Sequence, residues 1–369
     1  MPGGIGRGIK HAAINAGLVA ASLLITLLFG EFVLFRFVLL PSDVPENAFE
    51  NGLVRYAPHQ SGIWRVRNEI AAPFAINKQG WNSSVDDYAV ERRPGVMRVA
   101  VVGDSMVEAL QVAHDRSMAE RLATELSHDR PAVEVYRFGI SGAPLSQYLH
   151  MIEREVLLYR PDWIVVVLVH NDFDETFRFV QGRYTSSFLK LKVADGKVIE
   201  EVPPTPWQPG AADWVRRTAI GRYMYYRWQV HIGAIRDLFL RSAQAAAERY
   251  EANIDVAAVL RQMPEVAAAT DYVFARMAAV QKGGTRLLLA MDGVRGALYS
   301  DSTSPALALN ELSAELARKH GLEFIDLHPV FRAEWQINHR PFEFVSDGHW
   351  NEHGHAVAAR AVAHAIEER

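Results

Sequence analysis

The sequence predicts an α/β fold in which helices cover both faces of a parallel β-sheet. From about residue 96 onward, strand-like and helix-like segments alternate along the 369-residue chain, as they do when helices connect parallel strands. The segment WIVVVLV at 163–169 is continuously apolar and rich in β-branched residues, which is typical of a strand buried on both faces. Because ligands of such sheets bind beyond the carboxyl ends of the strands, the residues after each strand are the candidate functional residues.

The individual elements follow from local patterns. Short apolar runs predict strands at 98–102, 133–138, 163–169, 285–291 and 322–327. Helical spacing of apolar residues predicts helices at 117–127, 145–159, 263–281, 305–320 and 352–367. Pro161 stops the second of these helices.

The amino-terminal segment predicts a membrane anchor. Residues 12–30 contain no charge, and apolar runs continue around Glu31 and Arg36; about 20 apolar residues cross a bilayer core. Arg7 and Lys10 precede the span and acidic residues follow it, so the positive-inside rule places the short amino-terminal end in the cytoplasm and the rest outside. No small-x-small cleavage site follows, which favours an uncleaved anchor over a removed signal peptide or a buried core helix.

The chain therefore divides into three parts. Residues 1–40 form the cytoplasmic end and transmembrane anchor, 41–95 a linker with an irregular extension, and 96–369 the main domain. Within that domain, residues 172–260 interrupt the alternation with a Pro/Trp-rich loop and a stretch rich in aromatic residues and arginine. This insertion is expected to be a helical cap; a substrate-binding lid and a basic amphipathic helix on the membrane surface are the alternatives.

Composition excludes several classes of protein. The chain has 39 Lys+Arg against 43 Asp+Glu, a formal net charge of −4, whereas nucleic-acid binding needs a clustered positive excess. It contains no cysteine, which excludes disulfides, thiol nucleophiles, iron–sulfur clusters and Cys-ligated zinc. An oxidising compartment would therefore do the protein no harm.

Four sites carry residues suited to acyl transfer. Ser105 follows the strand at 98–102, at a turn into a helix whose N-terminus could stabilise an oxyanion, although a serine there could also simply cap the helix. Gly142 follows the second strand and could offer an exposed amide, or only make a turn. Asn171 follows the third strand and could donate to an oxyanion. Asp347 precedes His349 by two residues, and a histidine base needs such an acceptor to fix its tautomer.

His349, Glu352 and His353 also match the H-x-x-E-H pattern of some zinc proteases. That pattern requires both histidines on one helix face, whereas Gly348 and Asn351 predict a turn and a cap that leave His349 outside the helix. We therefore expect no metal and no cofactor. His353 and His355 are then expected on the helix surface.

Together, these motifs resemble the SGNH (GDSL-type) hydrolase superfamily over roughly residues 96–367, without the insertion. The resemblance implies a flavodoxin-like three-layer α/β/α sandwich. It implies that Ser105 is the nucleophile, His349 the general base and Asp347 its orienting acid. The oxyanion hole would comprise the amides of Ser105 and Gly142 and the Asn171 side chain. Three features depart from the usual motifs: Met106, Val169, and the D-x-H spacing in place of D-x-x-H. A backbone carbonyl or another carboxylate could thus orient His349.

The expected function is a serine-dependent esterase acting on small, acetyl-like esters through an acyl-enzyme. By resemblance, its substrates would be acylated carbohydrates of the cell envelope. The alternatives are an O-acyltransferase to polysaccharide that uses the same site, and a non-catalytic component of envelope assembly. The expected location is a bacterial inner membrane, crossed once, with the catalytic domain in the periplasm.

Overall fold

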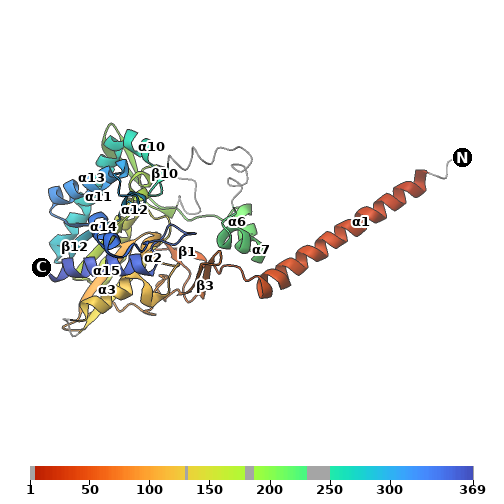
Figure 1. Ribbon diagram of the computed structural model, residues 1–369, viewed down its shortest axis with the longest axis horizontal. Helices are drawn as coiled ribbons and strands as arrows, with labels where there is room; N and C mark the ends of the chain where they lie inside the picture. The colour runs from red at the N-terminus through yellow and green to blue at the C-terminus, as the bar shows by residue number, and fades with distance from the viewer. Residues whose placement is uncertain (1–4, 129–131, 179–186, 231–249, 369) are drawn as a thin grey trace.

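A five-stranded parallel sheet forms the centre of the globular part of the protein (Figure 1). The computed structural model describes residues 5–128, 132–178, 187–230 and 250–368. The strand order β13-β12-β7-β5-β6 is the doubly wound, flavodoxin-like order, whose switch point lies between β5 and β7. The five strands are β5 Met97–Gly103, β6 Val133–Gly139, β7 Trp163–Leu168, β12 Arg286–Met291 and β13 Glu323–Asp326.

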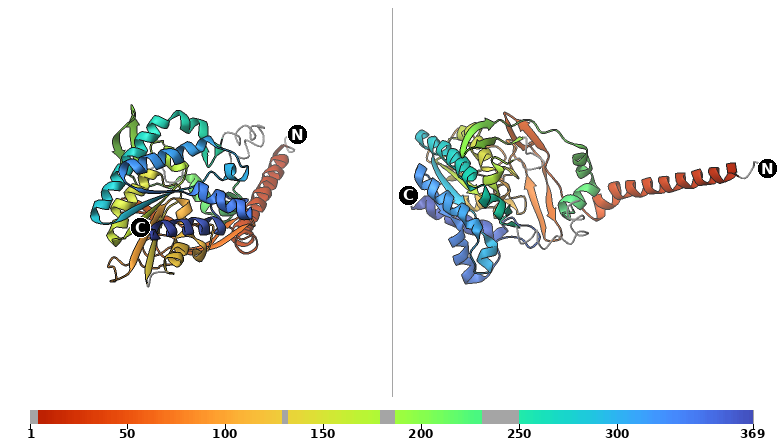
Figure 2. Two further views of the ribbon diagram at one scale, coloured as in Figure 1. Left: turned by 60° about the vertical axis from the view of Figure 1, so that its left-hand side comes forward. Right: turned by 90° about the horizontal axis from the view of Figure 1, so that it is seen from above.

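Helices cover both faces of this sheet and complete three layers (Figure 2). On strand β7, Val165 and Val167 belong to a core with helices α3, α14 and α15. Ile164 and Val166 point into the opposite core, with α4, α11 and α13. The helices and 3₁₀ turns of this domain are α2 Ser105–Glu108, η2 His114–Arg116, α3 Met118–Leu126, α4 Leu145–Arg154, η3 Val156–Tyr159, α5 Asn171–Glu175, α11 Met263–Val280, η6 Gln281–Gly283, α12 Arg295–Tyr299, η7 Pro305–Leu307, α13 Ala308–His320, α14 Leu327–Asn338 and α15 Glu352–Glu367.

The predicted α/β class is confirmed, and all five expected strands are present. The expected helix at 145–159 is divided: α4 ends at Arg154 and a 3₁₀ turn follows. Helix α14, which contains Pro329 near its start, was not expected. That proline lies in the first turn, where its missing N–H has no partner to lose.

The segment 41–95 is not an irregular extension, and its beginning is not simply a linker. It contains two antiparallel hairpins, β1 Asn47–Glu50 with β2 Leu53–Tyr56, and β3 Ser61–Val66 with β4 Ile70–Ala75. Asn51 and Gly52 connect the first pair with positive φ angles of 53° and 75°, the conformation of the tight Asn-Gly hairpin turn. Residues of both hairpins belong to the core of the α4 face of the sheet, so the segment packs as part of the same body.

The insertion 172–260 contains hairpins as well as helices, whereas the sequence predicted a helical cap. Residues 179–186 and 231–249 lie outside the described residues. The described elements are the hairpin β8 Lys190–Ala194 with β9 Lys197–Val202, the helices α6 Ala211–Arg217 and α7 Ala219–Gly221, the π-helix η5 Arg222–Arg227, the short hairpin β10 Tyr250–Glu251 with β11 Ile254–Asp255, and α10 Val256–Arg261.

The amino-terminal segment forms a long helix that projects from the globular part (Figures 1 and 2). Helix α1, Ile5–Phe29, continues into the π-helix η1, Gly30–Val38. Within the described ranges it is the one helix long and apolar enough to cross a membrane: Lys10–Val38 has a window of mean hydropathy 2.3, of which 6% is buried.

Candidate active site

Ser105 lies at the turn from strand β5 into helix α2, as the sequence predicts. The preceding residue, Asp104, caps the helix by accepting a hydrogen bond from the Met106 amide at 2.9 Å. The half-buried Ser105 hydroxyl donates to the other oxygen of the same carboxylate, at 3.2 Å. Burial raises the pKa of Asp104. Ser105 is therefore the first residue of the helix. Asp104 is the N-cap, so helix capping does not account for the serine at position 105.

Asp347 and His349 form a hydrogen-bonded pair despite their short spacing. Asp347 Oδ1 accepts both the His349 amide, at 3.0 Å, and the His349 Nδ1–H. Burial disfavours the imidazolium, but the adjacent carboxylate outweighs this and raises the pKa of His349. Burial likewise works against the Asp347 carboxylate, but the imidazole holds its pKa below the usual range. The D-x-H spacing thus allows contact, because the Asp347 carboxylate also accepts the His349 amide and so holds the chain in a tight turn.

The two remaining predicted residues lie beside these groups. Gly142 has a φ of +75°, in the region that favours glycine, and belongs to the loop after β6. Asn171 begins helix α5 directly after β7 and is 9% exposed. Its side chain hydrogen-bonds to the Glu175 carboxyl.

Two adjoining cavities bring the predicted residues together. Ser105, Asn171 and His349 line a cavity of about 370 Å³. Gly142, Asp347 and His349 line a larger cavity of about 660 Å³. His349 and Asn253 line both, so the histidine lies where the two spaces meet. The larger cavity also has aromatic and polar lining residues: Tyr56, Trp64, Glu108, Gln111, Phe188, Tyr225, Tyr226 and Gln229.

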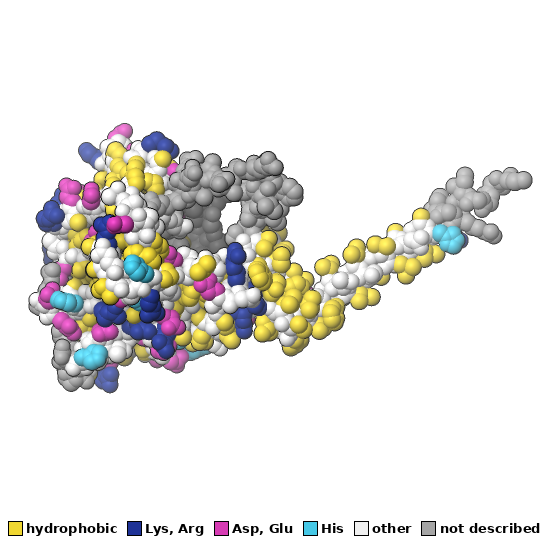
Figure 3. Space-filling view, viewed as in Figure 1, with side chains coloured by type: hydrophobic (Ala, Val, Ile, Leu, Met, Phe, Trp, Pro, Cys, Tyr) yellow, Lys and Arg dark blue, Asp and Glu magenta, His cyan; other side chains and the backbone are white. Residues whose placement is uncertain are grey.

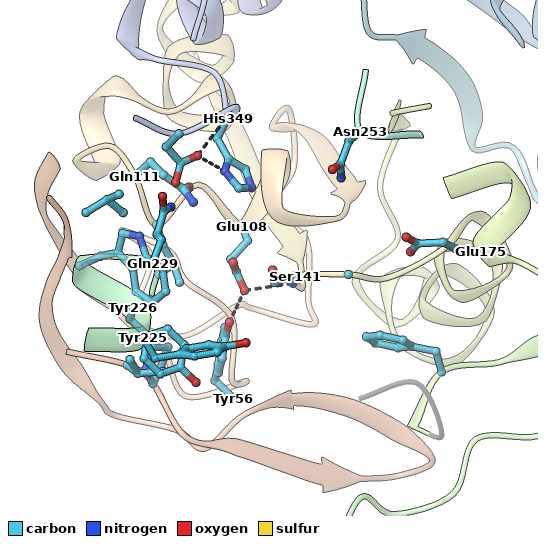
Figure 4. Close-up of a pocket in the computed structure, with 18 of the residues that line it drawn as sticks. Tyr56, Glu108, Gln111, Ser141, Glu175, Tyr225, Tyr226, Gln229, Asn253 and His349 are labelled. Atoms are coloured by element: carbon cyan, nitrogen blue, oxygen red, sulfur yellow. Dashed lines mark hydrogen bonds and ion pairs between the residues drawn. The ribbon is translucent and has the colours of Figure 1, made fainter. Parts of the chain in front are cut away.

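Sequence reasoning missed a buried carboxyl beside the candidate triad. Glu108 is 2% exposed and accepts hydrogen bonds from the Tyr56 hydroxyl and, at 3.1 Å, from the Ser141 amide (Figure 4). Burial raises the pKa of Glu108 to about 7. Gly139 permits this arrangement, since a Cβ there would lie 2.2 Å from the Glu108 nitrogen. The position of Glu108 three residues after Ser105, in the same helical turn, could have identified it.

The far side of the larger cavity carries two more titratable groups. Burial raises the pKa of Glu175 to about 7 and lowers the pKa of Lys190 to about 8. The Lys190 ammonium donates to the Glu175 backbone carbonyl at 2.6 Å. Both groups are therefore poised to change charge near neutral pH.

The zinc-protease pattern does not assemble. His349 lies before α15, as predicted, and no three His, Asp or Glu side chains cluster as metal ligands anywhere in the described ranges. The expectation that His353 and His355 lie on the helix surface is wrong. His353 stacks on Phe342, and the buried His355 accepts the Met118 amide through Nδ1 at 3.2 Å. His355 thus provides the acceptor for a backbone amide in the first turn of α3.

Residues 101–357 match the model of the GDSL-like Lipase/Acylhydrolase family. The chain belongs to this family. The match spans β5 to the beginning of α15 and includes every predicted site residue. The protein is therefore an ester-hydrolysing enzyme of the SGNH type, and the non-catalytic alternative loses its basis.

Solved structures similar to this GDSL-like acylhydrolase are distant. One is LAE5, an alpha/beta hydrolase enzyme from the metagenome of Lake Arreo, Spain, with 12% identity, coverage of 73% of this chain and 95% of that one, and a TM-score of 0.41. A lipase/acylhydrolase from Enterococcus faecalis has 11% identity, 74% and 96% coverage, and a TM-score of 0.41. A catalytic mutant of Axe2, an acetylxylan esterase from Geobacillus stearothermophilus, has 12% identity, 73% and 94% coverage, and a TM-score of 0.41. Curated proteins gave no match.

Proposed function

We propose that the protein is a serine esterase in which Ser105 is the nucleophile, His349 the general base and Asp347 its orienting acid. The observation that carries the proposal is the Asp347–His349 pair, whose imidazole lines the same cavity as the Ser105 hydroxyl. With Nδ1–H donated to Asp347, the other ring nitrogen is the one left to accept the serine proton.

In the first step, rotation about χ1 of Ser105 releases its hydroxyl from Asp104 and turns it toward His349. The oxygen attacks the ester carbonyl while His349 takes the proton, and the protonated histidine then gives it to the departing alcohol. In the second step water attacks the acyl-enzyme while His349 takes its proton; the ester bond to Ser105 then breaks, His349 returns the proton to the Ser105 oxygen, and the carboxylic acid leaves.

The oxyanion hole of the proposal comprises the backbone amides of Ser105 and Gly142 and the side-chain amide of Asn171. Three elements supply these donors: the start of α2, the loop after β6, and the start of α5. They surround the carboxyl ends of adjacent strands at the switch point of the sheet. Donors fixed in this way stabilise the tetrahedral intermediate without reorganising at the moment of reaction.

We propose a small, acetyl-like acyl group on a carbohydrate as the substrate. The larger cavity supports this choice, because Tyr225 and Tyr226 contribute aromatic rings to its lining while Gln111, Gln229 and Asn253 contribute side-chain amides (Figure 4). Sugar rings present this same mixture of apolar faces and hydroxyls.

The test compares the full chain in detergent with its Tyr226→Ala variant on acetylated oligosaccharides and on an aryl acetate. We expect acetate release from both substrates, with the variant losing kcat/KM about tenfold on the oligosaccharide alone. An equal effect on both substrates would contradict the carbohydrate assignment. Addition of unacetylated oligosaccharide tests the O-acyltransferase alternative: acetyl transfer in preference to hydrolysis would replace the esterase proposal.

We further propose that α1 crosses a bacterial inner membrane once and places the catalytic domain in the periplasm. The uncharged run at 12–30, with Arg7 and Lys10 before it, supports this orientation. Protease added to sealed, right-side-out spheroplasts should degrade the catalytic domain. Protection that is lost only after detergent treatment would overturn the proposed orientation.

A further inference from the structure

The insertion is attached to the end of the projecting helix by specific contacts. Glu31 of η1 accepts the amides of Ala219 and Ile220, at 2.7 and 3.0 Å, and so occupies the amino end of α7. Arg227 donates to the carbonyls of Leu39 and Leu40, just beyond the same helix. The Phe35 and Tyr223 rings lie 5.0 Å apart, edge to face. The segment 211–228, which we call the platform, therefore lies at a defined position along the helix axis.

That position coincides with the surface of the membrane that α1 is proposed to cross. The nineteen uncharged residues 12–30 rise roughly 28 Å as a helix, close to the ~30 Å thickness of the hydrocarbon core. Glu31 then lies at the outer boundary of the hydrocarbon. Because Glu31 binds the first amides of α7, the platform lies at the level of the lipid headgroups.

The exposed side chains of the platform suit that level. Trp214, Val215 and Met224 are 60%, 65% and 41% exposed, and Arg217 lies over the Trp214 ring at 5.0 Å. Figure 3 shows hydrophobic side chains gathered where α6 and α7 meet the projecting helix, with Lys and Arg side chains beside them. Tryptophan and arginine together are typical of membrane interfaces, where the ring is half immersed and the guanidinium reaches phosphate.

A cavity lined by arginines lies at the same level. A space of about 290 Å³ beside the end of the helix is lined by Arg36, Arg65 and Arg222, with Asp43 as its acidic residue. Arg222 binds Asp43 at 3.0 Å, and Arg65 lies 3.8 Å from the same carboxylate. Arg36 lies 3.7 Å from Glu31. Three guanidinium groups against these two carboxylates leave one net positive charge at the depth that lipid phosphates occupy, and arginine matches phosphate oxygens in charge and geometry.

The platform also forms part of the candidate active site. Tyr225 and Tyr226 line the larger cavity, and the Tyr226 ring packs edge to face on Trp64 at 5.9 Å. Within η5, therefore, Tyr223 contacts the projecting helix while its neighbours form a wall of the catalytic space.

We propose that the platform rests in the headgroup layer of the membrane crossed by α1, with lipid phosphates in the arginine cavity, and so forms the membrane-side wall of the active-site cavity. This inference rests on the proposed anchor. The platform contacts the lipid surface itself, so the substrate binds directly at the membrane surface rather than at the end of a flexible tether.

The absence of cysteine from the chain gives a direct test with single-cysteine variants of the full-length protein. Val215→Cys reports on the platform and Leu23→Cys on the anchor. Ile337→Cys, 81% exposed, reports on the end of helix α14, which Figure 1 shows apart from α6 and α7. Each variant carries an environment-sensitive fluorophore and is reconstituted in phosphatidylcholine–phosphatidylglycerol vesicles. Lipid nitroxides near the headgroup or deep in the acyl chains then quench the fluorescence.

We expect shallow nitroxides to quench the label at position 215 at least threefold more than the label at position 337, and deep nitroxides to quench the label at position 23. Quenching at 23 together with equal, weak quenching at 215 and 337 would overturn the platform proposal and leave the anchor intact. Absence of quenching at 23 would overturn the anchor, and this inference with it.

Discussion

The Tyr56 hydroxyl donates a hydrogen bond to the carboxyl of Glu108, three residues beyond Ser105. Tyr56 belongs to β2, in the segment before the catalytic domain, and both side chains are almost fully buried. The same Glu108 oxygen accepts the Ser141 amide, one residue before Gly142. The amino-terminal hairpin thus reaches the loop of the proposed oxyanion hole through a single buried carboxyl.

Glu108→Gln should flatten the pH dependence of stability. Burial raises the pKa of Glu108 to about 7, whereas an unfolded glutamate titrates near pH ~4.3. Between these values the folded state holds the extra proton, so the free energy of unfolding falls as pH rises. Glutamine should remove this contribution, on the order of 3 kcal/mol. Urea unfolding in one detergent, from pH 5 to 8, measures the difference between the two proteins. Parallel curves would show that Glu108 stays ionised in the fold.

Asp347→Asn should lower kcat by about 10³–10⁴-fold, because the amide disfavours the His349 tautomer that acts as base. Asp347 also raises the pKa of His349. Since the neutral imidazole is the active form, kcat/KM rises with pH through that pKa, and the variant should show this rise at lower pH. Stopped-flow rates from pH 4 to 9 measure both effects. Asp301→Asn, at an exposed ion pair with Arg332, is the control. Near-normal rates with an unmoved profile would mean that another group orients His349.

Asn171→Ala should reduce kcat by about 10²–10³-fold and leave KM nearly unchanged, since its donor acts on charge that develops in the transition state. Asn171→Asp has the same shape but carries an acceptor, so it should be at least as impaired. Steady-state hydrolysis of an aryl acetate gives the two parameters. A rise in KM at constant kcat would instead assign Asn171 to substrate binding.

Glu155→Ala should destabilise the attachment of the amino-terminal hairpins. The buried carboxylate binds Arg55 at 3.3 Å and accepts the Trp81 indole N–H at 2.9 Å. Its removal leaves the buried Arg55 guanidinium with only the more exposed Glu50 carboxylate, at 3.6 Å, as an ion-pair partner, and it leaves the Trp81 indole without its acceptor, which together should cost about 2–3 kcal/mol. Glu153→Ala breaks the more exposed pair with Arg276 and should cost about 1 kcal/mol or less. Equal losses in denaturant unfolding would show that the Glu155 contacts add nothing beyond an exposed pair.

The central sheet could be predicted from sequence because its strands are buried on both faces. Residues 163–169 show this as an uninterrupted apolar run, and the catalytic motifs follow the strands they were assigned to. Asp347 and His349 could be predicted as a pair, although their D-x-H spacing left other partners of the histidine open. These signals are local, so a single sequence carries them.

The elements that escaped prediction depend on distant contacts. Tyr56 and Glu108 are 52 residues apart, and nothing near either one indicates the other. His355 looked like a surface residue because the α3 amide it satisfies comes from Met118, 237 residues earlier. The β1–β2 turn is a different case: Asn51-Gly52 is a strong hairpin signal, hidden in a segment read only as rich in turns.

Covalent labelling shows whether Ser105 is an activated nucleophile. The full chain in detergent is treated with a fluorophosphonate probe, beside Ser105→Ala and Ser141→Ala. Ser141 also lines the larger cavity and has no proposed nucleophilic role, so it is the matched control. We predict labelling of the wild type and of Ser141→Ala, and none of Ser105→Ala, with the modified peptide containing residue 105. Labelling that survives in Ser105→Ala and disappears in Ser141→Ala would identify Ser141 as the nucleophile and exclude Ser105 from that role.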